Sequence, residues 1–221
     1  MAAILFGSIS TVVDTSELQR RAFNESFLAH DLHWNWSRED YQSMLGSNGG
    51  AQRIADYAEA RGDDVDAATV HATKSEIFQE LLRTAELDAR PGVLATIDEA
   101  KRSDHKLGFV TTTSQANIDA ILDVLKPHIS AKMFDLIVNS DSVQKPKPDP
   151  AAYAFALEQL GESADNVVAI EDNVGGVSAA AAAGVRCIAF PNENTADGDF
   201  SAAAETVDSL DPGRVLGLAT A

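Results

Sequence analysis

The sequence predicts an α/β protein with a doubly wound parallel sheet and an inserted α-helical cap. The first apolar run, Ala2–Phe6, carries no charge and suits a strand buried on both faces in the middle of a parallel sheet. Helical patterns without a strand signal follow it, and regular alternation of strands and helices begins only after Arg90. We therefore expect residues 1–15 and 91–221 to form the core, and residues 16–90 to form the cap.

Charge and composition exclude several classes of partner. The chain has 221 residues and a formal net charge of -17, so it repels nucleic acids and anionic membrane surfaces. Its apolar runs are too short to cross a bilayer, and the N-terminal residues lack the pattern of a secretory leader. The single cysteine, Cys187, lies in an apolar run and fits a reducing compartment, so we expect a cytoplasmic protein.

Helical patterns fill the expected cap. Asp14 or Thr15 is a suitable N-cap for the first helix, whose apolar residues recur at helical spacing. The predicted helices span residues 17–29, 38–45, 51–60 and 66–85. Trp34 and Trp36 alternate with polar residues between the first two helices, and we interpret them as packing anchors.

Strands and helices alternate in the rest of the chain. Pro91 suits the start of a helix that runs to about Arg102, and Asp149 with Pro150 suits the start of a later one. The predicted strands span residues 106–110, 136–138, 167–170 and 187–190, and helices at 117–125 and before Gly184 lie between them. The carboxyl ends of parallel strands meet at one edge of a sheet, so the polar residues that follow them are expected to lie together.

Four polar clusters follow these strands. Hydroxyl residues follow the first strand, threonines occupy positions 111–113, Lys145 lies in the loop after the third strand, and Glu171 with Asp172 ends the fourth. Taken singly, the threonines are common turn residues and Lys145 is an ordinary surface lysine. Two adjacent carboxylates after an apolar strand are costly to bury unless a cation compensates them. Together the clusters are typical of a phosphate and magnesium site.

The motifs resemble those of the haloacid dehalogenase superfamily, and in particular its β-phosphoglucomutase-like phosphatases, which have a Rossmann-like core and a helical cap. The resemblance covers nearly the whole chain. The motifs that carry it are Phe109-Val110-Thr111, Lys145-Pro146-Lys147-Pro148-Asp149, Ile170-Glu171-Asp172-Asn173 with Ala182-Ala183-Gly184, and Lys74-Ser75-Glu76-Ile77-Phe78 in the cap.

The resemblance implies a role for several of these residues. Thr111 would bind the transferring phosphate, and Lys145 would bridge that phosphate and the acidic pair. Asp172 would bind Mg²⁺ directly, with Glu171 supporting it. In the cap, segment 46–50 resembles the substrate-specificity loop, so Gly49, and the nearby cations Arg53 and Lys74, are candidate substrate contacts. Ordinary solvated helix charges are the alternative for the two cations.

The first motif departs from the family pattern. The family reads Phe-Asp-x-Asp-Gly-Thr, whereas this chain reads Phe6-Gly7-Ser8-Ile9-Ser10-Thr11. Gly7 takes the place of the aspartate nucleophile, and Ile9 takes that of the general acid/base aspartate. Glycine offers no group to attack phosphorus, and isoleucine cannot transfer a proton. The metal also loses a ligand, so we expect weak or no Mg²⁺ binding. The alternative role for Lys145 is then a simple ion pair with Glu171 or Asp172.

The anion-binding part of the site is expected to survive. The backbone at Ser8, the side chain of Thr111, the amide of Thr112 and Lys145 can hold a phosphate or an inorganic anion. The Ser8 side chain itself is expected to point away from positions 7 and 9, because side chains alternate along a strand.

Two functions remain open from the sequence. The first is a catalytically impaired protein on a phosphatase scaffold that binds a phosphorylated small molecule, and the residues at positions 7 and 9 favour it. The second is an active hydrolase that acts on a small phosphorylated metabolite by a non-standard mechanism, such as attack by water with Glu171 as base. A monomer is expected, since the cap closes over its own core.

Overall fold

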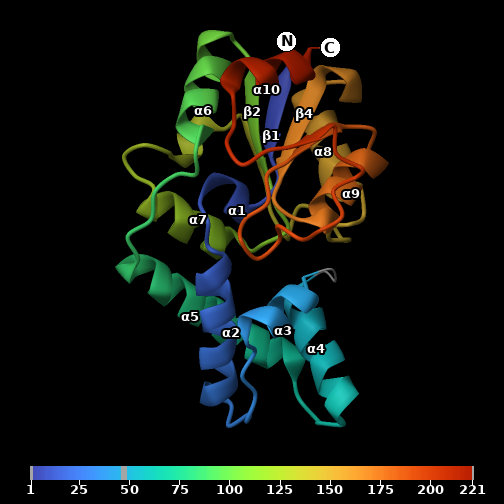
Figure 1. Cartoon of the computed structure of the whole chain (residues 1–221). Helices are drawn as coiled ribbons and strands as arrows, with labels where there is room; N and C mark the ends of the chain where they lie inside the picture. The colour runs from blue at the N-terminus through green and yellow to red at the C-terminus, as the bar shows by residue number, and fades with distance from the viewer. Residues whose placement is uncertain (1, 46–48, 221) are drawn as a thin grey trace.

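The computed structural model describes residues 2–45 and 49–220. Its strands form one parallel sheet in the order β3-β2-β1-β4-β5-β6, with the first strand in the interior as predicted (Figure 1). The strands are β1 (Ala3–Phe6), β2 (Lys106–Val110), β3 (Leu136–Val138), β4 (Val167–Glu171), β5 (Arg186–Ala189) and β6 (Glu205–Thr206). The strand order reverses between β1 and β4, which is where open α/β sheets bind ligands.

Helices cover both faces of this sheet, so the doubly wound arrangement is confirmed. One face carries α6 (Val93–Arg102), α7 (Gln115–Val124) and α10 (Pro212–Ala219), and the other carries α8 (Ala151–Leu160) and α9 (Val174–Ala182). Phe6 and Ile170 pack on the first face, and Leu5 and Ala169 pack on the second. Apolar side chains therefore alternate between two separate layers of the core.

The strand register determines which residues meet at the carboxyl edge. Phe6 pairs with Ile170 across β1 and β4, and the N–H of Gly7 donates to the carbonyl oxygen of Ile170 at 2.8 Å. Gly7 therefore lies beside Glu171. Since side chains alternate, positions 7 and 171 face the α8/α9 side, and the next residues, 8 and 172, face the opposite side.

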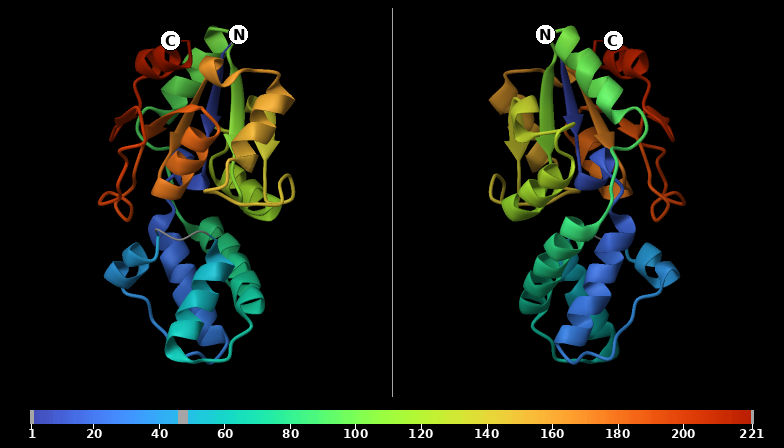
Figure 2. Two further views of the ribbon diagram at one scale, coloured as in Figure 1. Left: turned by 90° about the vertical axis from the view of Figure 1, so that its right-hand side faces the viewer. Right: turned by 90° about the vertical axis from the view of Figure 1, so that its left-hand side faces the viewer.

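The helices of the inserted segment lie beyond the carboxyl edge of the sheet, and both chain termini lie at the other end of the molecule (Figures 1 and 2). These helices are α2 (Ser16–Ala29), α3 (Arg38–Ser43), α4 (Gly50–Arg61) and α5 (Ala67–Thr84). Trp34 and Trp36 are buried in a separate hydrophobic cluster formed by residues of the inserted segment. The ring centroids of Trp36 and Phe27 lie 4.6 Å apart. Both tryptophans are packing anchors, as interpreted. We propose that this segment is a separate cap with boundaries near residues 16 and 90.

Five described elements were not predicted: α1 (Ile9–Val12), β6, α10 and the short 3₁₀ helices η1 (Ala131–Met133) and η2 (Ala164–Asn166). α1 is a single turn made largely of β-branched residues, which are weak helix formers. By contrast, the strands at 106–110 and 136–138 have the predicted bounds. Within residues 2–45 and 49–220, no helix combines the length and the hydropathy needed to cross a bilayer.

Candidate active site

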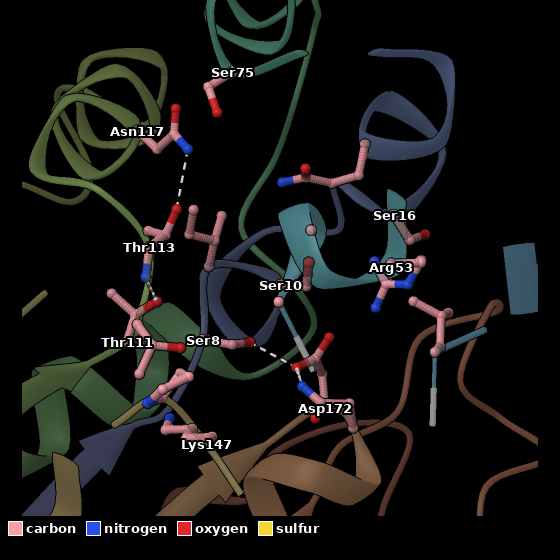
Figure 3. A pocket seen from close by; sticks show the side chains of 18 of the residues that line it. Ser8, Ser10, Ser16, Arg53, Ser75, Thr111, Thr113, Asn117, Lys147 and Asp172 are labelled. Atoms are coloured by element: carbon pink, nitrogen blue, oxygen red, sulfur yellow. Dashed lines mark hydrogen bonds between the residues drawn. The ribbon is translucent and has the colours of Figure 1, made fainter. Parts of the chain in front are cut away.

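A cleft of about 730 Å³ separates the carboxyl edge of the sheet from the cap. Ser8, Thr111, Lys147 and Asp172 lie on its core side, and Arg53 lies on its cap side (Figure 3). Its size suits a small metabolite. The predicted clusters after β1, β2 and β4 therefore meet in one place.

Lys147 and Glu171 form a buried ion pair in the core wall of the cleft, with Nζ and Oε1 2.6 Å apart. Lys147 Nζ also donates to the carbonyl oxygens of Val110, at 2.6 Å, and of Gly7. The hydroxyl of Tyr153 on α8 donates to Glu171 Oε1 at 2.6 Å. Burial raises the pKa of Glu171, and the charge of Lys147 opposes that rise. All three hydrogens of the ammonium group are therefore used in hydrogen bonds within the protein.

The prediction that Lys145 contacts the acidic pair is wrong. Its side chain is 75% exposed and pairs with Asp149 at 3.6 Å, whereas Lys147 is 7% exposed and reaches Glu171. Both lysines belong to one Lys-Pro-Lys-Pro segment. Only Lys147 lies within reach of the carbonyl oxygens at the ends of β1 and β2, which is why it is the buried one.

The positions of the two missing carboxylates are filled by the protein itself. A Cβ atom added to Gly7 would lie 2.2 Å from Glu171 Oε1 and 2.4 Å from the hydroxyl oxygen of Tyr153. Ile9 is buried in the core cluster and is 6% exposed. Neither position supplies a nucleophile or a proton donor.

Neutral donors hold the carboxylate of Asp172. Ser8 Oγ donates to Oδ1 at 2.6 Å, Asn173 Nδ2 donates to Oδ1 at 2.9 Å, and Asn192 Nδ2 donates to Oδ2 at 3.0 Å. Ser8 therefore contacts Asp172 (Figure 3). Gly7 lies against Glu171 instead, as strand alternation predicts.

These residues do not fit the magnesium site that the motifs suggested. Glu171 is turned toward Lys147, and both oxygens of Asp172 already accept hydrogen bonds. Mg²⁺ requires oxygen ligands in near-octahedral geometry. Among the described residues, no group of three or more His, Cys, Asp or Glu side chains is placed to hold a metal ion.

The threonines after β2 lie on the cleft, as expected. Thr111 Oγ1 accepts from the N–H of Thr113 at 3.2 Å, and Thr113 Oγ1 accepts from Asn117 Nδ2 at 3.0 Å. Asn117 Oδ1 in turn accepts from Gln79 of α5 at 2.9 Å, so these contacts join the core to the cap. The role of Thr111 and Thr112 in binding phosphate stays a prediction.

The two cap cations are buried, so the alternative of ordinary solvated charges is wrong. Lys74 is 5% exposed and Arg53 is 8% exposed, and both line the cleft. Lys74 Nζ lies 4.7 Å from the ring centroid of Phe23, and the Arg53 guanidinium lies 5.9 Å from the same ring. Burial, with a smaller contribution from Arg53, lowers the pKa of Lys74 to about 7.

The predicted specificity loop is described only in part. Gly49 lines the cleft with a φ of 81°, a conformation that favours glycine. Gly46, Ser47 and Asn48 lie outside the described residues.

Sequence reasoning missed Tyr153 and Asn192, which fix the two carboxylates. Tyr153 lies in the first turn of α8, and Asn192 lies in the turn after β5, where no motif marks either residue. The available signal is indirect: the buried acidic pair requires donors, and parallel strands bring these two segments to the same edge.

The sequence model described as haloacid dehalogenase-like hydrolase matches residues 7–190. This chain belongs to that family. The match spans both the sheet and the inserted helices, in agreement with the motifs and the strand order described above.

Several relatives are similar over nearly the whole chain. Protein CbbY of Cereibacter sphaeroides is 38% identical over 211 residues, which are 94% of this chain and 92% of that protein. The phosphorylated carbohydrates phosphatase of Thermotoga maritima is 28% identical over 98% of this chain and 97% of that protein. The crystal structure of CbbY from Rhodobacter sphaeroides in complex with phosphate has a TM-score of 0.88 at 38% identity, with 95% of both chains covered. A mutant of that protein in complex with xylulose-(1,5)bisphosphate is similar to the same degree.

Proposed function

We propose that this protein binds a phosphorylated sugar in the cleft between core and cap. The observation that carries the proposal is the pair of buried cations, Arg53 and Lys74, on the cap wall of that cleft. Arg53 Nε donates to the carbonyl oxygen of Met44 at 3.0 Å, and Lys74 Nζ donates to Gln19 Oε1, so neutral oxygens orient both cations. Their positive charges lie on the cleft, where a phosphate group can form charge-assisted hydrogen bonds with them. The relatives support a sugar phosphate as the ligand class, because CbbY structures contain phosphate and xylulose-(1,5)bisphosphate.

The charges in the cleft favour the cap end for the phosphate. Lys147 is neutralised by Glu171, and Asp172 adds a negative charge that accepts hydrogen bonds from the neutral side chains of Ser8, Asn173 and Asn192. The core end therefore carries less positive charge than the sequence suggested. The hydroxyl groups of Ser8 and Thr111 at that end suit the hydroxyls of a sugar.

We propose further that hydrolysis through an aspartyl phosphate is absent. That route needs a carboxylate aligned with phosphorus, whereas the space at Gly7 is occupied by Glu171 and Tyr153. Glu171 is also unsuited to act as the base for attack by water, because it is fully buried and its Oε1 already accepts hydrogen bonds from Lys147 and Tyr153.

An active hydrolase is the second candidate, and the names of the relatives support it more directly than they support an inactive protein. The specific observation in its favour is the 2.6 Å hydrogen bond from Ser8 to Asp172. In this route Ser8 Oγ forms the bond to phosphorus and passes its proton to Asp172, while the bond from phosphorus to the sugar oxygen breaks. The sugar oxygen takes the proton, and water then releases phosphate from the serine.

One set of measurements separates these candidates. Binding of xylulose 1,5-bisphosphate and glucose 6-phosphate is measured by calorimetry, and phosphate release from both is measured after repeated purification. We expect binding that weakens by about tenfold or more in Lys74→Met, but not in the control Lys101→Met, an exposed residue of α6. Absence of binding to both sugars would contradict the proposed function.

Phosphate release decides the catalytic question. We expect none above the level of Ser8→Ala or Asp172→Asn. Release by the wild type that is lost in both variants, together with a phosphoryl adduct on Ser8 in the intact mass, would establish the second candidate.

Two further properties belong to this proposal. We propose a monomer, because residues of a single chain line both walls of the cleft, and a cytoplasmic location, because the lone Cys187 is a buried free thiol. Sedimentation equilibrium tests the first, and cell fractionation tests the second.

A further inference from the structure

The carboxyl group of Glu171 lies in a narrow slot between two glycines. A Cβ atom at Gly7 would lie 2.2 Å from its Oε1, and a Cβ atom at Gly176 of α9 would lie 2.1 Å from its Cδ. Such distances are far inside van der Waals contact. The carboxyl group can therefore take this place only while both neighbours lack side chains.

Polar contacts hold Glu171 in the slot. Lys147 Nζ and the hydroxyl of Tyr153 each lie 2.6 Å from its Oε1. The ammonium group also binds the carbonyl oxygens of Gly7 and Val110. A fixed positive charge thus lies among oxygens at the carboxyl ends of three neighbouring strands, an environment that resembles the ligand set of a cation.

We propose that the Lys147–Glu171 pair takes the place of a divalent metal in this protein, and that sugar phosphates bind without Mg²⁺. The second part rests on the proposed function. Lys147 compensates the charge of Glu171 at the carboxyl edge, so the fully buried Glu171 needs no added cation. Asp172 is the carboxylate that remains, with both oxygens hydrogen-bonded to Ser8, Asn173 and Asn192. One such carboxylate gives a poor Mg²⁺ site.

Because Glu171 fits the slot only beside glycine, a substitution at position 7 should restore carboxylates to the cleft. A side chain at residue 7 would overlap the carboxyl group of Glu171, and we expect that group to turn toward the cleft, where Asp172 lies. With Gly7→Asp, three carboxylates would then share one edge of the sheet, which is the oxygen-rich environment that Mg²⁺ and Mn²⁺ prefer. Gly7→Ala would displace Glu171 without adding the third carboxylate.

Mn²⁺ binding, followed by electron paramagnetic resonance, tests the proposal on the intact protein. Asp172→Asn is the matched control, because it reports the Mn²⁺ that the acidic surface binds non-specifically. We expect the wild type and Asp172→Asn to bind Mn²⁺ equally, and Gly7→Asp to bind it at least about tenfold more tightly. Mn²⁺ binding by the wild type that Asp172→Asn removes would overturn the proposal, as would a folded Gly7→Asp variant without added Mn²⁺ affinity.

Calorimetry of xylulose 1,5-bisphosphate with the wild type, in Mg²⁺ and in EDTA, tests the second part. We expect dissociation constants that agree within about twofold, which is less than 0.5 kcal/mol. Binding that requires Mg²⁺ would overturn the inference and leave the proposed function standing. Lack of binding under both conditions would contradict the proposed function instead, and the Mn²⁺ titration would still decide the metal question. The comparison of wild type with Asp172→Asn remains decisive if Gly7→Asp does not fold.

Discussion

Two lysines lie two residues apart in the loop after β3, and only Lys147 is buried against a carboxylate. Removing one partner of a buried ion pair leaves the other without compensation. We expect Lys147→Met to lower the free energy of unfolding by about 3–5 kcal/mol, whereas Lys145→Met leaves it unchanged within error. Urea denaturation of both variants measures this, and equal midpoints for the two would contradict the assignment of Lys147.

Lys74 is expected to reduce stability at low pH. Burial lowers its pKa to about 7, below its ordinary value of 10.5, so the unfolded chain binds more protons between these two values. The free energy of unfolding therefore rises with pH across this window, and the penalty is complete below about pH 7. We expect Lys74→Met to raise the melting temperature more at about pH 6 than at about pH 9.5.

Differential scanning calorimetry at both pH values measures the effect of Lys74→Met. Lys101→Met is the control, because Lys101 is exposed and should show no such difference. A gain that is the same at both pH values would mean that Lys74 titrates as an ordinary lysine in the folded protein.

At the level of single residues, the sequence shows which residue type stands at each motif position, but it does not show where the side chain points. Gly7 and Ile9 are visible as departures from a motif, and they predict the loss of its nucleophile and of its acid/base. Whether Lys145 or Lys147 enters the cleft depends on which of them reaches the ends of β1 and β2, and that distance is not encoded in the spacing of the loop. The fit of Glu171 beside Gly7 depends on strand register, which is likewise invisible in a single sequence.

Helix α3 contacts the turn after β5, and this contact leads into the candidate site. Arg38 of α3 lies 2.6 Å from Glu193 and donates to Asn194 Oδ1 at 2.9 Å. The N–H of Asn194 donates to Asn192 Oδ1 at 2.9 Å, and Asn192 binds Asp172. A chain of hydrogen bonds therefore connects α3 of the cap to the carboxylate of Asp172.

We expect Arg38→Met to loosen both ends of this connection. Hydrogen exchange of α3 and of residues 192–195 would become faster, because exchange reports local opening. Arg21→Met is the control, since Arg21 is exposed and pairs with Glu25 within α2. Mass spectrometry after deuterium labelling measures both variants, and unchanged exchange in the turn would show that Arg38 does not hold the two parts together.

Among the elements, strong patterns were predicted well and weak ones were not. The apolar strands and the longer amphipathic helices appear where periodicity placed them. α1 and β6 are too short to show a period, and α10 contains two glycines that weaken a helical pattern. Tertiary contacts determine these elements: the α10 residues Val215 and Ala219 are buried in the core.

The whole molecule carries a net charge of -17, and the composition alone leads to a prediction about its stability. Self-repulsion destabilises a compact state, and salt screens it, since the Debye length falls from about 10 Å at 0.1 M to about 3 Å at 1 M. We expect the melting temperature to rise by about 5 °C or more between low salt and 1 M KCl. Thermal unfolding followed by circular dichroism measures this rise.

A variant with less negative charge separates repulsion from other effects of salt. Asp64, Glu86 and Asp88 are exposed, so replacing them with Asn, Gln and Asn makes the net charge less negative without disturbing the core. This triple variant should be more stable than the wild type at low salt and should gain less from KCl, because less repulsion remains to be screened. If it gains as much as the wild type, the stabilisation by salt comes from solvent effects on apolar burial, which do not depend on these charges.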